Sequence, residues 1–353
     1  MTGTADQEQS GTAAEGQHVR TILDLAFAQM RTHLLGTAAR LGIFDLLGDG
    51  ERTAAGLAEA LGIPPGPAHR LLRALAGERL LVETEPGTFR STPAGALLRS
   101  GVPGSMLAVA TTFTDPVMMR GWEHLEESLR TGRPSFDTVF GTDFFGYLTT
   151  RPELSAEFNA AMGQATRAAA DIIPHHYAFG RFACVVDVGG GDGTLLSAIL
   201  RAHPGLRGIV HDTAEGLAQA AARFAADGLA DRATTVTGDF FASVPPGGDL
   251  YLLKSVLHDW DDAQCATILG NVRKAVPDDG ALLIVEPVLP PAVPAGDPGL
   301  AYLSDLNMLV NLGGRERTED DFAALCATAG FRLETVHPLP HPHPFRLIEA
   351  RPA

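Results

Sequence analysis

Short apolar runs alternate with helical stretches from residue 184 to residue 286, and this alternation limits the possible folds more than any other feature. The runs are apolar throughout instead of alternating with polar residues, which indicates strands buried on both faces. The sequence therefore predicts an α/β domain over residues 181–353 with a parallel sheet covered by helices. The strands are expected at 184–188, 207–211, 234–237, 249–254 and 281–286, the helices near 193–203, 215–227 and 263–275, and two antiparallel edge strands at 331–336 and 345–349.

Glycine and acidic residues stand where the first strand ends, in Asp187-Val-Gly-Gly-Gly-Asp-Gly193. Gly189 and Gly191 allow a sharp turn and a close approach to a ligand just before a helix begins. Position 194 is a threonine, not the glycine of a dinucleotide fingerprint, and no Gly-Lys-Ser/Thr follows, so neither that site nor a P-loop is indicated. The carboxylate of Asp187 disfavours a pyrophosphate and favours a positively charged ligand.

Polar groups also follow the later strands. Asp212 ends the second strand, where an acid accepts hydrogen bonds from ribose hydroxyls. A carboxylate and an aromatic ring after the third strand suit an adenine amino group and an adenine face. Because the carboxyl ends of parallel strands meet at one edge of the sheet, we expect all these groups to form one site. The later strands are followed by Gly238, Asp239, Phe240, Lys254, His258, Asp259 and Glu286.

The first part of the chain, residues 19–105, is predicted to be a mainly helical, winged-helix-like domain. Apolar residues at helical spacing predict one long helix over 21–47, and two short helices and a hairpin at 80–84 and 88–91 follow. Winged helices often bind DNA, but the net charge of −15 and the neighbouring glutamates count against nucleic acid as a partner. We therefore expect the domain to dimerise through the long helix.

Further features of the sequence limit the kinds of protein that this chain can be. Residues 1–18 are polar and have no apolar core, which predicts a disordered tail and no signal peptide. No apolar stretch reaches the roughly 20 residues that a membrane helix needs, and three separated cysteines indicate reduced thiols in a cytoplasmic protein. Residues 106–180 are predicted to be a helical linker whose aromatic residues either pack in the core or line a pocket for a flat ligand.

Four motifs together resemble one enzyme family. They are Gly189-Gly-Gly-Asp-Gly193, Gly238-Asp-Phe240, Leu253-Lys through His258-Asp-Trp260, and Gly313-Gly-Arg-Glu-Arg-Thr318. This set resembles the S-adenosylmethionine-dependent small-molecule O-methyltransferases of plants and actinobacteria. The resemblance implies a class I methyltransferase fold, with a Rossmann-like seven-stranded sheet behind a winged-helix dimerisation domain. It also implies a homodimer, S-adenosylmethionine as cofactor and no metal.

The resemblance implies roles for individual residues as well. His258 matches the general base, and Glu286 and Glu316 match the two acids that orient it. A phenol has a pKa of about 10, so it is protonated at neutral pH; a neutral imidazole with a pKa near 6.5 takes that proton as the oxygen attacks. The cofactor-binding positions are Asp187, Gly189 and Gly191 for the methionine part, Asp212 for the ribose, and Gly238, Asp239, Phe240 and Lys254 around the adenine.

The acceptor pocket is predicted from one helix and its neighbours. Asn307 and Asn311 lie four positions apart and so share a helix face with Met308 beside them; capping or solvent exposure is the alternative for the two amides. Phe158, Met162 and Asp259 complete the predicted substrate contacts. We expect methylation of a phenolic hydroxyl on an aromatic secondary metabolite such as a polyketide. A relative that performs hydroxylation or decarboxylation, and a DNA-binding regulator, remain alternatives.

Overall fold

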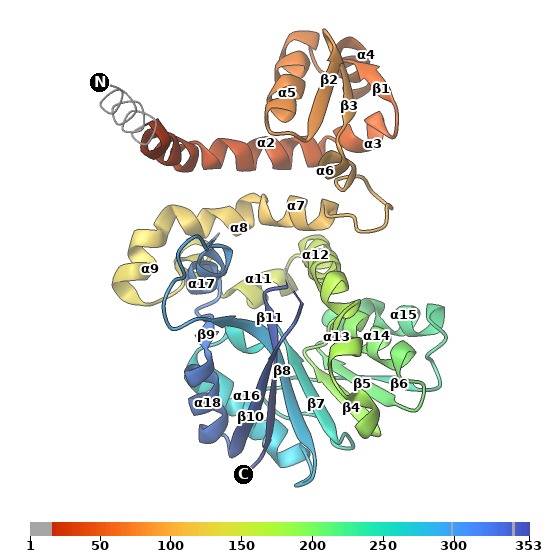
Figure 1. The fold of residues 1–353 in the computed structure, drawn as a ribbon, viewed down its shortest axis with the longest axis vertical. Coiled ribbons are helices and arrows are strands. Elements are labelled where there is room, and N and C mark those ends of the chain that lie inside the picture. The colour runs from red at the N-terminus through yellow and green to blue at the C-terminus, as the bar shows by residue number, and fades with distance from the viewer. Residues whose placement is uncertain (1–15, 298, 341–342) are drawn as a thin grey trace, which may run out of the picture. The chain divides into compact units, whose positions relative to one another are not determined.

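The computed structural model describes residues 16–297, 299–340 and 343–353, which form two compact units divided between Asp115 and Pro116 (Figure 1). The predicted linker 106–180 is thus split, because residues 106–115 belong to the first unit and 116–180 to the second. Of the predicted tail 1–18, only residues 16–18 are described, and they are helical. No helix in the described part is both long and apolar enough to cross a membrane.

The first unit contains the predicted winged helix. Thr53 caps the first short helix, since its hydroxyl accepts a hydrogen bond from the amide of Gly56 at 3.1 Å. The hairpin pairs antiparallel with a third strand, β1, that the sequence did not predict, in the order β1-β3-β2. The elements are α2 (Ala28–Arg40), α3 (Ile43–Leu47), β1 (Glu51–Thr53), α4 (Ala54–Leu61), α5 (Pro65–Gly77), β2 (Leu81–Glu85), β3 (Thr88–Ser91), α6 (Pro93–Ala96) and α7 (Leu107–Phe113).

The prediction of one long helix over 21–47 is wrong. The helix that covers residues 16–26 is interrupted at Phe27, and α2 ends before Gly42, which has a φ of 67°. Glycine adopts this left-handed conformation without the penalty that a Cβ atom brings. The chain therefore changes direction, and Ile43 and Phe44 of α3 enter the core of the unit.

The second unit is built on the predicted sheet. Seven strands lie in the order β10-β11-β8-β7-β4-β5-β6, and the short β9 pairs with β8. Five neighbouring strands, β8, β7, β4, β5 and β6, run parallel, and β11 and β10 are antiparallel at one edge, as predicted. The strands are β4 (Cys184–Val188), β5 (Arg207–Asp212), β6 (Ala233–Thr237), β7 (Leu250–Lys254), β8 (Ala281–Leu289), β9 (Arg317–Thr318), β10 (Phe331–Pro338) and β11 (Phe345–Pro352).

Helices cover both faces of this sheet (Figure 1). Successive residues of β7 show this directly, because Leu252 packs into one apolar cluster and Leu253 into the other. One cluster includes residues of α14 and α15, and the other includes residues of α16 and α18. The elements between and beyond the strands are α14 (Thr194–Ala202), η3 (Gly216–Gln219), α15 (Ala220–Ala226), η4 (Leu257–Asp259), α16 (Asp262–Ala275), α17 (Leu300–Asn311) and α18 (Glu319–Thr328).

A helical segment precedes the sheet within the second unit. Its buried aromatic residues, Phe136 and Phe144, form an apolar cluster with Met118 and Leu148. Core packing is therefore the role of these rings, while Phe145 and Phe158 at the edge of the cluster stay half-buried. The elements are α8 (Pro116–Arg120), η1 (Gly121–His124), α9 (Leu125–Thr131), α10 (Ser135–Phe140), α11 (Phe144–Thr149), α12 (Pro152–Ala170), α13 (Ile173–His176) and η2 (Phe179–Arg181).

Candidate active site

The glycine turn after β4 lies against the segment that carries His258. Gly189 has a φ of 72°, and a Cβ atom at this position would lie 2.7 Å from Cγ2 of Val256. Gly191 has a φ of 53° and donates its amide hydrogen to Oδ2 of Asp212 at 2.8 Å. The turn is therefore fixed at both ends, with its glycines in conformations and spaces that other residues do not fit.

Asp187 lies beneath this turn. Its side chain is buried, and Oδ2 has no hydrogen-bonding partner among the described residues. Burial, followed by the charge of Asp212, raises its pKa to about 7. A buried carboxylate oxygen without a partner is costly, so this atom is suited to a cationic donor group of a ligand.

Asp212 orders the glycine turn and also lies at the edge of the sheet where the ligand is expected. Its Oδ1 accepts a hydrogen bond from the amide of Thr213 at 2.7 Å, and its Oδ2 accepts the bond from Gly191. Burial raises its pKa, while these two backbone amides oppose the rise. Part of its hydrogen-bonding capacity therefore orders the loop, and the remaining lone pairs are available to hydroxyl groups.

The predicted adenine contacts follow β6. Gly238 approaches His211 so closely that a Cβ atom would lie 2.6 Å from Cε1 of that ring. The carboxylate of Asp239, which is exposed, accepts a hydrogen bond from the amide of Phe241 at 2.8 Å. Phe240 is half-buried, and its ring lies 6.2 Å from that of Trp260. Phe240 thus lies between the glycine turn, where a Cβ atom on Gly189 would be 3.7 Å from its ring, and the segment after His258.

Lys254 ends β7 in the middle of the site. Its Nζ donates a hydrogen bond to Oγ1 of Thr166 on α12 at 3.1 Å. Burial lowers its pKa, and the charges of Glu286, Asp187 and Asp259 act in the opposite direction. The ammonium group therefore lies between the acid beneath the glycine turn and the acids around His258.

His258 lies in η4, and its ring is held by the two predicted acids. Nδ1 is 3.1 Å from Oε1 of Glu316, at hydrogen-bonding distance, and 3.6 Å from Oε2 of Glu286. Glu316 is fixed in turn by the hydroxyl of Ser304, which donates to the same Oε1 at 2.7 Å. Its backbone amide donates to Asp305 at 2.8 Å. Sequence reasoning missed Ser304 and Asp305, because nothing in the sequence indicates that α17 folds back onto Glu316.

The carboxylates change the protonation of His258. Burial alone would lower its pKa, but Glu286, Asp259 and Glu316 outweigh burial and raise it from 6.5 to about 10. The sequence-based expectation of an ordinary pKa near 6.5 did not allow for these three carboxylates, which favour the protonated ring. Asp259, whose Oδ1 is 3.4 Å from Nε2, has its own pKa raised to about 7 by burial. A proton must leave this cluster before the ring can act as a base.

Asn307 and Asn311 hold the helices together. Asn311 is 1% exposed and donates to Oδ1 of Asn307 at 2.9 Å, and that oxygen also accepts from Nε1 of Trp122 at 3.0 Å. The alternative of solvent exposure is therefore excluded for Asn311. Met308 beside them is buried. The two amides link α17 to η1, which fixes the indole ring of Trp122.

Two of the remaining predicted acceptor contacts, Phe158 and Met162, are on α12. Phe158 and Met162 are half-buried and lie four positions apart on α12. The Phe158 ring is 5.2 Å from that of Phe144, and the neighbouring Phe145 stacks on Trp260 at 5.4 Å. Trp260 is two residues beyond His258, so Phe145 packs against the segment that carries the candidate base.

The acids and cations of the site allow a test of the predicted cofactor. Four carboxyl groups, those of Asp187, Asp259, Glu286 and Glu316, interact with the cationic groups of Lys254 and His258, and Asp212 adds a further acid beside Asp187. An acidic excess of this kind, together with the free Oδ2 of Asp187, fits a ligand with a sulfonium and an ammonium group. The residues present therefore suit S-adenosylmethionine.

Three side chains around the candidate base are also of the types that bind metal ions. His258, Glu286 and Glu316 offer ligand atoms that all lie within 4.8 Å of one another. Oε1 of Glu286 accepts hydrogen bonds from the amides of Val256 and Leu257, and Oε1 of Glu316 accepts from Ser304. Oε1 of each carboxylate thus already has structural partners, whereas Oε2 of each has no hydrogen-bonding partner among the described residues. The expectation of no metal continues to rest on the family resemblance.

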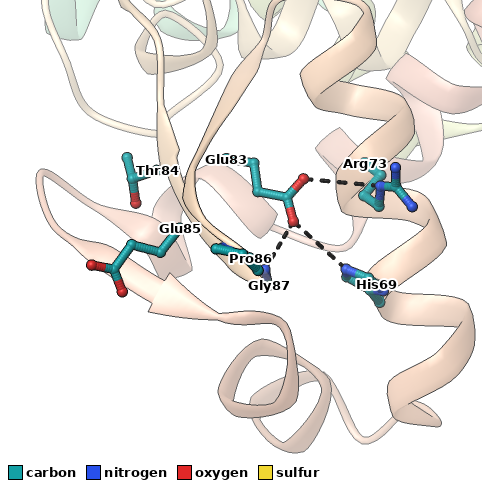
Figure 2. Close-up of a pocket in the computed structure, with 7 residues that line it drawn as sticks. All are labelled: His69, Arg73, Glu83, Thr84, Glu85, Pro86 and Gly87. Carbon is teal, nitrogen blue, oxygen red and sulfur yellow. Dashed lines mark hydrogen bonds and ion pairs between the residues drawn. The ribbon is translucent and has the colours of Figure 1, made fainter.

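The winged helix lacks the electrostatics of a DNA reader. Figure 2 shows Glu83 of the hairpin facing His69 and Arg73 of α5, with carboxylate-to-cation distances of 3.8 and 3.9 Å. Glu83 also accepts the amide of Gly87 at 2.8 Å, which ties the acid to the hairpin turn. Glu83 therefore opposes the charge of Arg73, one of the two arginines of α5, which is unfavourable for binding phosphate groups.

Comparison with known proteins agrees with this geometry. A family model described as an O-methyltransferase domain matches residues 122–332, and an O-methyltransferase dimerisation domain matches residues 23–101. The chain is 49% identical over 333 residues to O-demethylpuromycin-O-methyltransferase of Streptomyces alboniger, a match that covers 94% of this chain and 88% of the relative. The solved structure of mitomycin 7-O-methyltransferase has a TM-score of 0.89 at 36% identity and covers 97% of this chain and 100% of that one.

A further relative was solved with its ligands. An O-methyltransferase from neocarzinostatin biosynthesis, in complex with S-adenosylmethionine and 2-hydroxy-5-methyl naphthoic acid, has a TM-score of 0.78 at 33% identity. The match covers 92% of this chain and 96% of that chain. Most of the length of both units thus matches one kind of enzyme. The chain belongs to the family of S-adenosylmethionine-dependent O-methyltransferases.

Proposed function

We propose that this enzyme methylates a phenolic hydroxyl of an aromatic secondary metabolite, with His258 as general base and Glu316 and Glu286 as the acids that orient it. The observation that carries the proposal is the contact between the glycine turn and the His258 segment, through Gly189 and Val256. Across this contact, the turn that we propose to bind the donor adjoins the segment of an imidazole that has three carboxylates around it. Two relatives named above are methyltransferases of O-demethylpuromycin and of mitomycin, and the third was solved in complex with a naphthoic acid, which supports an aromatic acceptor.

Bound S-adenosylmethionine supplies a methyl group on a sulfonium, which needs no further activation. The chain's own residues have three tasks. Asp187 and the glycine turn hold the cationic donor, and the aromatic residues around Trp260 exclude water from the acceptor ring. Glu316 engages Nδ1 of His258, so Nε2 is the atom that accepts the phenolic proton. Asp259, next to Nε2, stabilises the imidazolium that results.

The proposal predicts that His258→Ala keeps donor binding and loses catalysis. Binding of S-adenosylhomocysteine is measured by calorimetry, and turnover is measured with labelled S-adenosylmethionine and a panel of aromatic polyketides, phenazines and phenylpropanoids. We expect an affinity within about twofold of wild type and turnover lower by about 100-fold or more. His337→Ala, which changes an exposed histidine on β10, is the matched control. Full turnover by His258→Ala would show that positioning alone suffices.

We also propose that the enzyme is a homodimer that uses the exposed apolar side chains near the start of the described chain. Residues 19–30 expose several large apolar side chains, among which Ile22 is 68% and Leu25 72% exposed. Such a surface indicates a protein interface, and the dimerisation-domain match begins in the same segment. Light scattering should give a dimer for wild type and a monomer for the double variant Ile22→Glu, Leu25→Glu. A wild-type monomer would contradict the proposal. Cytoplasmic location stays a prediction from the sequence.

A further inference from the structure

The turn that carries His258 is short and has little support of its own. η4 spans three residues, Leu257–Asp259, and Ser255 just before it has a φ of 52°, in the left-handed region. A residue other than glycine in this region raises the local free energy and persists only where its surroundings hold it. The position of the imidazole therefore depends on contacts from elsewhere in the chain.

One side of the turn is held by an acid. Oε1 of Glu286 accepts hydrogen bonds from the amides of Val256 and Leu257 at 2.8 and 3.0 Å. Glu286 is completely buried, so these bonds are shielded from water. These bonds fix the N–H groups at the start of the turn, but a carboxylate cannot donate hydrogen bonds to the carbonyl groups of the turn.

The carbonyl side is held by Arg317, which the proposed mechanism does not use. Its Nη1 donates to the carbonyl oxygen of Leu257 at 2.7 Å, and its Nη2 donates to that of Trp260 at 2.9 Å. These two carbonyls flank His258 in the sequence. The side chain of Arg317 is 0% exposed, and its charge is paired with Asp262 at 2.7 Å. The planar guanidinium thus spans the whole turn with donors in a fixed geometry.

A second feature of the same segment brings the two backbones together. A Cβ atom on Gly314 would lie 2.0 Å from the carbonyl oxygen of His258 and 2.4 Å from the carbonyl carbon of Asp259. Only glycine allows this approach. Residues 314–317 therefore lie against the His258 turn from Gly314 to Arg317, and Glu316 between them reaches Nδ1 of the ring.

We propose that Arg317 is a positioning residue for methyl transfer: by binding the carbonyl groups of Leu257 and Trp260, it sets the distance between His258 and Glu316. The inference rests on the proposed role of His258 as the base. A lysine keeps the charge of Arg317 but has one nitrogen in place of a planar fork, so it does not hold both carbonyls in the same geometry. The expected effect falls on the orientation of His258 and leaves the donor-binding loop unchanged.

The test compares Arg317→Lys with Arg315→Lys in the full-length enzyme. Arg315 is the matched control, because it also pairs with Asp262, at 2.9 Å, but is exposed. We expect Arg317→Lys to lower turnover of the best acceptor by about 10- to 100-fold, with an affinity for S-adenosylhomocysteine within about twofold of wild type. Arg315→Lys should match wild type in both. Unchanged turnover in Arg317→Lys, or equal losses of turnover and binding, would overturn the proposal.

A second measurement separates this proposal from the proposed function. The His258 ring is titrated by nitrogen-15 NMR with labelled histidine, and its signal is assigned from the spectrum of His258→Gln. Arg317→Lys should move the titration by at least about one pH unit toward the ordinary value, since the ring loses its close carboxylate. An unshifted titration overturns the role of Arg317, whether or not the wild type methylates any acceptor. If Arg317→Lys does not fold, Asp262→Asn should shift the titration in the same direction, and no shift beyond that of Arg315→Lys overturns the proposal.

Discussion

The protonation of His258 predicts a rate of methyl transfer that rises with pH. The carboxylates of Glu286, Asp259 and Glu316 raise the pKa of the ring to about 10, above its ordinary 6.5. A raised pKa means that the ring keeps its proton as the pH increases through the neutral range. At pH 7 a group with this pKa is neutral in about one molecule in a thousand. The form that accepts a phenolic proton therefore becomes about tenfold more abundant with each pH unit.

The assay is kcat/KM for one acceptor at saturating S-adenosylmethionine from pH 6 to pH 10. We expect a slope of about one in the logarithm, which levels off between the ordinary histidine value and about 10, because the cationic donor lowers the pKa of the ring. Asp259→Asn removes one of the charges that raise this pKa and should move the plateau to lower pH. The acceptor's own ionisation is measured with His258→Asn, which lacks the base.

A wild-type profile of kcat/KM that is flat from pH 6.5 to pH 9 would refute this prediction. That result would mean that His258 is already neutral in the complex and that the surrounding carboxylates are themselves protonated. The same slope in His258→Asn as in the wild type would also refute the prediction, since the slope would then reflect the ionisation of the acceptor. His337→Ala serves as the control for any general effect of pH on the enzyme.

Three other perturbations test separate parts of the site. Asp187→Asn should weaken S-adenosylmethionine binding by about 10- to 100-fold in calorimetry, because the free Oδ2 would no longer be a charged acceptor; an unchanged affinity would assign the donor's ammonium group elsewhere. Gly189→Ala should cost about 1–2 kcal/mol for its left-handed φ alone, and more from the clash with Val256. Its thermal unfolding midpoint and donor affinity should both fall, and wild-type values for both would contradict the geometry of the turn. EDTA should leave turnover unchanged, whereas a loss that Mg²⁺ or Zn²⁺ restores would assign a metal to His258, Glu286 and Glu316.

The repeating patterns of the sequence were sufficient for the fold. Continuous apolar runs between helical stretches predict a parallel sheet covered on both faces, and the structure has that sheet, with its antiparallel edge formed by β10 and β11. Because the strands are parallel, Asp187, Asp212 and Glu286 had to meet at one edge. The exception is the helix predicted over 21–47, which is interrupted at Phe27 and ends before Gly42 with its left-handed φ.

The electrostatic surroundings and the support of the His258 ring were decided by the tertiary structure alone. Glu286 and Glu316 lie 28 and 58 positions from His258 along the chain, yet both come within 3.6 Å of its Nδ1. Spacing indicates which residue types share a site, but a pKa depends on distances and burial that only the folded chain sets. The same holds for Arg317, whose motif was visible in the sequence while its hold on two backbone carbonyls was not. Local periodicity determines the elements of this enzyme, and contacts between distant segments determine its chemistry.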